Sequence, residues 1–167
     1  MVQDILDKLG GRAIAVGLMA ASAAVLASAY GFQFIGGLQP CPLCLYQRVP
    51  WWVALGLAAL ALRLHRSPRA RDGAVLLGAA AVLVGAGIAG YHAGVEYKWW
   101  TGPTACSGVG GTAQSLDALR AQIMSAAVVR CDETPWSLFG VSMAGYNFLL
   151  SLFVGLGAGW AVWMTRR

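Results

Sequence analysis

Residues 13–35, AIAVGLMAASAAVLASAYGFQFI, contain no charged side chain and are long enough to form a helix that crosses a lipid bilayer. Such a crossing needs about 20 predominantly apolar residues. Three further apolar runs follow, at 43–62, 73–95 and 139–164. Because a helix satisfies its own backbone hydrogen bonds inside lipid, the four runs predict an all-α membrane protein, a bundle of four transmembrane helices.

The composition excludes a water-soluble globule. Hydrophobic residues make up 58% of the 167-residue chain and charged residues 11%, whereas soluble domains carry roughly 25% charged residues. The chain length suits a single membrane domain, 1–167. The net charge of +5 does not indicate nucleic-acid binding, because the basic residues lie between and outside the apolar runs and form no basic face.

The distribution of positive charge predicts the orientation in the membrane. Lysine and arginine gather in the N-terminal tail, in the 63–71 connection and at the C-terminus, whereas the long 96–138 loop carries few for its length. The positive-inside rule therefore predicts cytoplasmic termini and an outer 96–138 loop. Tryptophans near the predicted outer helix ends suit an interfacial aromatic belt there, namely Trp51, Trp52, Trp99 and Trp100.

Two further segments have competing interpretations. Ala27-Ser28-Ala29 could be a signal-peptide cleavage site, but the apolar run continues to Ile35 and the preceding tail contains acidic residues. Residues 115–126 predict a short helix that either lies on the membrane surface or is fully solvated, preceded by a glycine-rich segment at 107–112.

The four cysteines, Cys41, Cys44, Cys106 and Cys131, all fall on the predicted outer side. Disulfides persist in such an oxidising compartment. Three pairings are possible, and Cys41–Cys44 with Cys106–Cys131 is the one that keeps each pair local. Structural disulfides are a poor explanation of Cys41 and Cys44, because a loop closed over so few residues restrains the unfolded chain little. Zinc is disfavoured, because no second closely spaced pair exists and the compartment is oxidising.

The stretch QPCPLCLYQR, residues 39–48, favours redox chemistry. Pro42 suits the first turn of a helix, which places Cys41 near the N-cap and Cys44 in the first turn, where the helix dipole stabilises thiolate. Arg48 follows four residues after Cys44, on the same face and about 6 Å along the axis. An arginine in a membrane span indicates a functional site, here to hold thiolate and bind an acceptor carbonyl. The alternative is an arginine that snorkels to the headgroups.

These residues resemble the disulfide bond formation protein B family, DsbB, over nearly the whole chain. The resemblance rests on PCPLCLYQR at 40–48, the lone Cys106, Cys131-Asp132 followed by WSLFGVSM at 136–143, and the four predicted spans. It implies a disulfide-generating protein thiol:quinone oxidoreductase of the bacterial inner membrane. The resemblance also implies a periplasmic DsbA-like thioredoxin-fold protein as partner, and ubiquinone or menaquinone from the membrane pool as acceptor.

The resemblance also implies residue roles. Cys106 forms a mixed disulfide with the partner, Cys131 then attacks Cys41, and Cys44 leaves as thiolate and reduces quinone beside Arg48. His92, near the outer end of the third span, matches a family histidine by location and would act near the quinone; the alternative is an interfacial histidine bonded to the loop. Gln47 stands where some relatives carry glutamate, so no acidic role is assigned to it.

Two other functional hypotheses remain open at this point. A vitamin K epoxide reductase-like enzyme also couples a C-x-x-C pair to a quinone, but its active pair lies in a later helix than Cys41. A non-catalytic four-span protein with structural disulfides would show no electron-transfer defect after Cys44→Ala.

Overall fold

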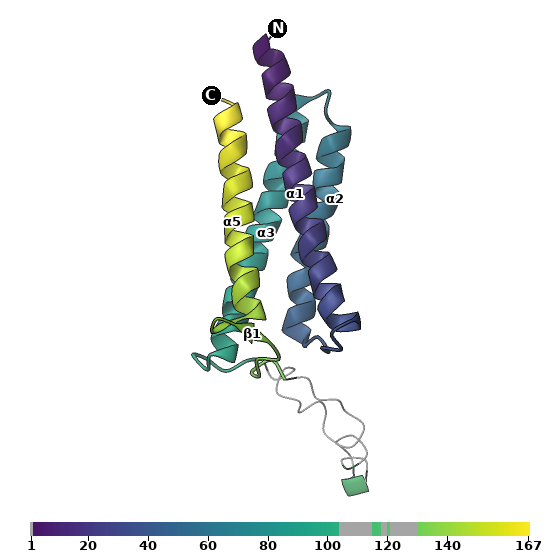
Figure 1. Cartoon of the computed structure of the whole chain (residues 1–167), viewed down its shortest axis with the longest axis vertical. Coiled ribbons are helices and arrows are strands. Elements are labelled where there is room, and N and C mark those ends of the chain that lie inside the picture. Colours follow the sequence, from purple (N-terminus) through teal and green to yellow (C-terminus); the bar gives the residue numbers. More distant parts are fainter. Residues whose placement is uncertain (1, 104–114, 118–119, 121–129) are drawn as a thin grey trace.

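The computed structural model describes residues 2–103, 115–117, 120 and 130–167, with side chains from residue 10 onward. Four long helices dominate these residues: α1 (Val2–Phe34), α2 (Pro42–Arg63), α3 (Pro68–Glu96) and α5 (Met143–Thr165). Each contains a segment long and apolar enough to cross a membrane. The four helices run side by side as an elongated bundle (Figure 1), which confirms the predicted all-α membrane architecture. The segments predicted at 107–112 and 115–126 lie mostly outside the described residues.

Three helix starts differ from the sequence prediction. Helix α1 begins at Val2 and not at residue 13, because the apolar run marks only the part of the helix that is suited to lipid. Helix α3 begins at Pro68 and not at residue 73, because proline is favoured in the first turn, where its missing N–H would have no partner anyway. Residues 139–142 are not helical. They belong to a hairpin of β1 (Ser137–Leu138) and β2 (Val141–Ser142), whose turn residues Phe139 and Gly140 have φ of 51° and 77°, the geometry of a type I′ turn.

Small residues bring the helices close together. Helix α3 packs most extensively against α2 and α5, and α1 packs mainly against α2. Glycines on α3 face neighbouring side chains: Gly78 faces Leu18, Gly85 faces Pro50 and Gly90 faces Phe148. Such close approach is the usual basis of helix association in membranes. Gly87 has no such neighbour and lies on the open surface of α3.

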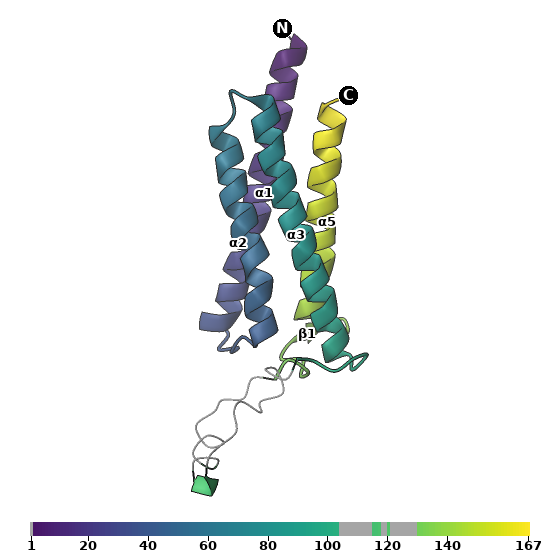
Figure 2. The same cartoon turned by 180° about the vertical axis from the view of Figure 1, so that it is seen from behind.

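The two ends of the bundle differ in chemistry. Both termini and the α2–α3 connection lie at one end, and the hairpin and the start of α2 lie at the other (Figures 1 and 2). At the terminal end, Asp72 binds Arg71 at 2.8 Å and Arg166 at 3.2 Å. At the hairpin end, Trp52, Trp99 and Trp100 are exposed, whereas Trp51 is 1% exposed. The expectation that Trp51 joins an interfacial belt is wrong, because its ring packs in the core.

Candidate active site

Cys41 is the N-cap of α2. Its backbone is extended, with φ of −72° and ψ of 165°, and Pro42 follows as the first helical residue. The Cys41 Sγ accepts a hydrogen bond from the backbone N–H of Cys44 at 3.2 Å. Capping of this kind satisfies one of the free N–H groups of the first turn and puts the sulfur at the positive end of the helix dipole. The local sequence thus aims both sulfurs at the end of the bundle.

The two sulfurs form a close dithiol pair. Cys41 and Cys44 are free thiols, and their Sγ atoms lie 2.8 Å apart. Cys41 is buried, whereas Cys44 is partly exposed. The hydrogen bond with the Cys44 thiol and the contact with His92 outweigh burial and lower the pKa of Cys41 to about 5. Cys41 is therefore a thiolate at neutral pH, the form that performs nucleophilic and redox chemistry.

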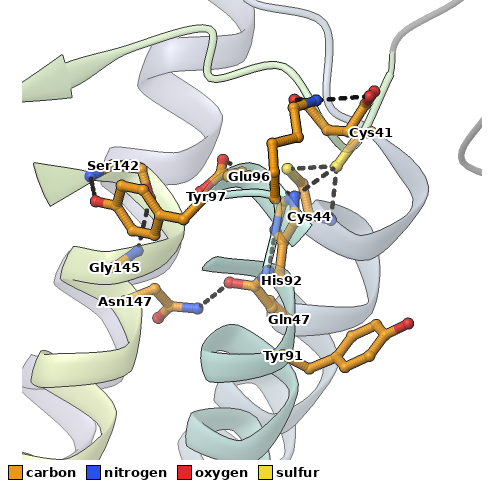
Figure 3. Close-up of polar contacts among 12 residues, drawn as sticks. Cys41, Cys44, Gln47, Tyr91, His92, Glu96, Tyr97, Ser142, Gly145 and Asn147 are labelled. Atoms are coloured by element: carbon orange, nitrogen blue, oxygen red, sulfur yellow. Dashed lines mark hydrogen bonds and ion pairs between the residues drawn. The ribbon is translucent and has the colours of Figure 1, made fainter. Parts of the chain in front are cut away.

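His92 lies against the dithiol (Figure 3). Its Nε2 is 3.6 Å from the Cys41 Sγ and 3.9 Å from the Glu96 Oε1. Its Nδ1 is 2.7 Å from the Gln47 Nε2, and Gln47 in turn binds Asn147 (Figure 3). The sequence placed His92 near Arg48 in depth, but the structure puts its ring directly beside Cys41. The predicted role of His92 at a quinone is not tested by this geometry.

Arg48 faces α1. Its Nη1 donates to the Gln33 Oε1 at 2.6 Å, and its Cζ lies 4.7 Å from the centre of the Tyr30 ring. These described contacts leave Arg48 half-buried one turn beyond Cys44, and they do not include either sulfur. The contacts expected to favour thiolate therefore gather on Cys41, through Cys44 and His92, and Arg48 remains a candidate for binding an acceptor.

Cys131 is brought to the dithiol from a distant part of the chain. It is fully buried and packs in one cluster with Cys41, Leu43 and Val95. It is disulfide-bonded, and Cys106 lies outside the described residues. The next residue, Asp132, accepts from Lys98 at 2.7 Å, which ties this segment to the end of α3.

The negative charge on Asp132 maintains its hydrogen bond with Lys98. Hydrogen bonds from Arg130 and then Lys98 hold the pKa of Asp132 well below its usual range. The carboxylate thus stays ionised across physiological pH.

A groove lies between α2 and α3, and one of its lining residues, Leu43, belongs to the cluster that contains Cys41. Its volume is about 600 Å³, within the range of small-molecule sites. Its lining is Leu43, Tyr46, Val49, Pro50, Val84, Gly87, Ile88 and Tyr91. Almost all of this lining is apolar, and Arg48 is not part of it.

The donor set also has the composition of a metal site. The ligand atoms of Cys41, Cys44 and His92 all lie within 4.8 Å of one another, and thiolate with imidazole suits zinc and other thiophilic cations. The sequence argument against zinc considered the cysteines alone and did not foresee that His92 completes a third ligand position.

Sequence reasoning missed three residues that support His92. Gln47 was assigned no role, Trp51 was expected only in an interfacial belt, and Asn147 was not considered. Yet Trp51 donates to Asn147 at 2.9 Å and Asn147 donates to Gln47 at 2.6 Å. The available signal was polarity, because Asn147 is a carboxamide inside an otherwise apolar span, where polar groups are costly and usually have partners.

The fold and this geometry define a class: a four-span membrane protein with a reactive dithiol at a helix N-terminus and a disulfide-bonded cysteine packed against it. Comparison of the sequence with known protein families leads to the same class of protein. The family model "Disulfide bond formation protein DsbB" matches residues 11–161. The chain belongs to this family, and it is an oxidoreductase of disulfide bond formation.

Several curated relatives carry the name "Disulfide bond formation protein B". The chain is 36% identical to the one from Methylococcus capsulatus, over 81% of this chain and 83% of the relative. It is 33% identical to that of Nitrosococcus oceani, over 86% of each, and 31% identical to that of Hahella chejuensis, over 88% and 89%. No solved structure matches the chain.

Proposed function

We propose that the protein re-oxidises a periplasmic DsbA-like dithiol protein and passes the electrons to a membrane quinone, ubiquinone or menaquinone. The observation that carries this proposal is the packing of Cys131, fully buried, in one cluster with Cys41. A disulfide in the long loop and a dithiol at the membrane surface are then close enough to exchange. Thiol–disulfide exchange needs such contact, because a thiolate must attack a disulfide sulfur directly.

The first half-reaction transfers a disulfide outward. A thiolate of the reduced partner attacks Cys106 in a Cys106–Cys131 disulfide, and Cys131 leaves as thiolate. Cys131 then attacks Cys41 in the oxidised Cys41–Cys44 pair, and Cys44 leaves as thiolate. The second partner thiol attacks the mixed disulfide and releases the oxidised partner and Cys106. Cys106 restores the bond to Cys131 and frees Cys41, so two electrons now reside on the Cys41–Cys44 dithiol.

The second half-reaction re-oxidises that dithiol. A bound quinone would accept the two electrons of the dithiol, one proton from the Cys44 thiol and one from solvent, because Cys41 is already a thiolate. Cys44 is the partly exposed sulfur of the pair and faces the acceptor, while Cys41 closes the new disulfide. Arg48 donates to an acceptor carbonyl oxygen. Only one of its five N–H groups has an acceptor among the described residues, so donors remain for a ligand.

The proposed location is the bacterial inner membrane, with the cysteines in the periplasm and both termini in the cytoplasm. The terminal end of the bundle carries Arg71 and Arg166 around Asp72 and the basic 63–71 connection. A positively charged end of this kind faces the cytoplasm. The dithiol at the opposite end then meets periplasmic partners.

Turnover with a reduced thioredoxin-fold protein as donor and a short-chain quinone as acceptor tests the proposal. We expect activity in the wild type, none in Cys44→Ser, and a trapped Cys106–partner disulfide when the wild-type chain meets a partner whose second active-site cysteine is replaced by serine. Arg48→Met should lower kcat/KM for quinone roughly 10-fold or more, the effect of losing a charged hydrogen bond. Arg63→Met, an exposed arginine at the opposite end of α2, is the matched control and should not. Full turnover in Cys44→Ser would refute the proposal.

A further inference from the structure

Four side chains form a continuous hydrogen-bonded chain that ends at His92. The Trp51 Nε1 lies 2.9 Å from the Asn147 Oδ1, the Asn147 Nδ2 lies 2.6 Å from the Gln47 Oε1, and the Gln47 Nε2 lies 2.7 Å from the His92 Nδ1. Trp51, Gln47 and His92 are all buried. The chain connects α2, α5 and α3, and Figure 3 shows its Asn147–Gln47–His92 part.

The direction of every hydrogen bond in this chain is fixed by Trp51. An indole N–H can only donate, so the atom of Asn147 that meets it is the carbonyl oxygen. The amide nitrogen of Asn147 then faces Gln47, which must present its own oxygen. The amide nitrogen of Gln47 therefore faces His92. Ser151 adds a weak contact to the same Asn147 oxygen at 3.5 Å.

This direction selects one form of the histidine ring. An amide nitrogen donates, so the His92 Nδ1 must accept and carries no proton. The neutral ring then carries its proton on Nε2. That nitrogen faces the Cys41 Sγ at 3.6 Å and the Glu96 Oε1 at 3.9 Å. Both neighbours are hydrogen-bond acceptors. The contacts of Nδ1 and those of Nε2 therefore require the same tautomer.

The same tautomer is unsuited to binding a metal. A histidine that ligates through one nitrogen normally donates the other ring N–H to a carboxylate, a carbonyl or water. His92 does the reverse, because its second nitrogen accepts from an amide. Ligation through Nε2 would put a proton on Nδ1, directly against the N–H groups of Gln47. The hydrogen bonds made by Gln47, Asn147 and Trp51 would all have to reverse direction, and the Trp51 N–H cannot accept.

We propose that Trp51, Asn147 and Gln47 are positioning residues that hold His92 as an Nε2–H donor to Cys41 and so keep the reduced site from binding thiophilic divalent cations. The cluster otherwise has two cysteine sulfurs and an imidazole within ligand range. The benefit of excluding metal rests on the proposed function, because a captured cation would block the dithiol. The tautomer itself does not depend on that function.

Two nearly isosteric substitutions reverse the direction of these hydrogen bonds without removing them. Gln47→Glu replaces the donor to Nδ1 by a carboxylate oxygen and still accepts from Asn147. Asn147→Asp still accepts from Trp51 but makes Gln47 turn its oxygen toward His92. Each change should move the proton of His92 to Nδ1 and free the Nε2 lone pair. His65 is the second histidine of the chain, so His65→Gln provides a background with one imidazole.

Nitrogen-15 NMR of histidine-labelled, reduced protein in the His65→Gln background reads the tautomer directly. We expect the Nε2–H form in the parent and the Nδ1–H form in both variants. A parent in the Nδ1–H form, or variants that leave the tautomer unchanged, would overturn the inference. A purely structural role would alter thermal unfolding but would not exchange the two nitrogen resonances.

Cadmium binding to the reduced protein is the second readout. Outer partners of a ligating histidine typically change metal affinity by about 10- to 100-fold, so Gln47→Glu and Asn147→Asp should each tighten cadmium binding by about 10-fold or more. Adding His92→Ala should abolish the gain. Unchanged affinity in both variants would refute metal exclusion. If the parent failed to reduce quinone yet showed the Nε2–H form, the proposed function would fail and the assignment of the tautomer would stand.

Discussion

The sulfur of Cys41 meets several hydrogen-bond donors at one point. The Cys44 thiol, the Cys44 backbone N–H and the His92 Nε2 all lie within 3.6 Å of it. Hydrogen bonds to a charged group favour that charge. Burial acts in the opposite direction but is the smaller effect, so the pKa of Cys41 falls to about 5.

A pH titration of the thiolate absorbance tests this balance. With Cys106 and Cys131 held in a disulfide, we expect the Cys41 thiolate to persist as pH falls and to be lost only near pH 5. Cys44→Ala removes the principal donor and should move the midpoint upward, toward the roughly 8.5 of an ordinary thiol. Cys44→Ser keeps a hydroxyl donor and should move it less. An equal midpoint in all three proteins would contradict the assignment.

At the scale of residues, the sequence pattern predicted the local geometry at the start of α2 better than the contacts made between helices. The C-x-x-C spacing and Pro42 predicted the N-cap position of Cys41, because both effects are local to one helix turn. The pattern also indicated Arg48 as the partner of the Cys44 thiolate, whereas the described contacts of Arg48 include neither sulfur and His92 lies beside Cys41. His92 comes from another helix, and the rotation of α3 against α2 depends on packing that no local pattern encodes.

At the scale of elements, two glycines of α5 test how closely α5 packs against α3. A Cβ at Gly155 would lie 2.7 Å from the Leu83 Cγ and 3.2 Å from the Ala79 backbone oxygen, whereas one at Gly157 meets nothing within 4 Å. Backbone atoms of a buried helix cannot move aside easily. The interface therefore requires glycine at 155 and not at 157.

Gly155→Ala and Gly157→Ala form a matched pair. Gly155→Ala should destabilise the protein by about 1–3 kcal/mol, the usual cost of overpacking. Gly157→Ala should be neutral or stabilising by up to about 1 kcal/mol, because alanine has the higher helix propensity. Thermal unfolding in detergent, followed by circular dichroism, measures both. Equal melting temperatures would mean that α5 does not pack against α3 as described.

Element boundaries show where sequence reasoning stopped short. Apolar runs located all four helices because lipid imposes a minimum length on each span. The same reasoning extended the last helix to Phe139, because the hairpin residues are themselves apolar. Hydropathy cannot separate a short strand pair from a helix end. The Phe139-Gly140 turn, with two positive φ values, was the missed signal.

At the scale of the molecule, the chemistry divides between two ends. The dithiol, the hairpin and Cys131 occupy one end, and both termini and the α2–α3 connection occupy the other (Figures 1 and 2). Four spans always return the chain to the side on which it began. The proposed orientation therefore decides the compartment of every functional group at once.

Labelling with a membrane-impermeant maleimide tests that orientation. Ser67→Cys and Thr101→Cys, both at exposed positions, are placed separately in a background whose own cysteines are replaced by serine. We expect Thr101→Cys to react in intact spheroplasts and Ser67→Cys to react only after lysis. The reverse pattern would put the dithiol in the cytoplasm and exclude a periplasmic partner.

The transfer of electrons from Cys41 and Cys44 to quinone is tested most directly without any partner protein. The purified, reduced protein, with Cys106 and Cys131 replaced by serine, is mixed anaerobically with a short-chain quinone, and both hydroquinone and remaining thiols are counted. The account predicts that two thiols, Cys41 and Cys44, are lost for each quinone reduced in the wild type, and that Cys44→Ser reduces none. Equal quinone reduction by Cys44→Ser, or loss of the Cys41 and Cys44 thiols at the same rate without quinone, would contradict it.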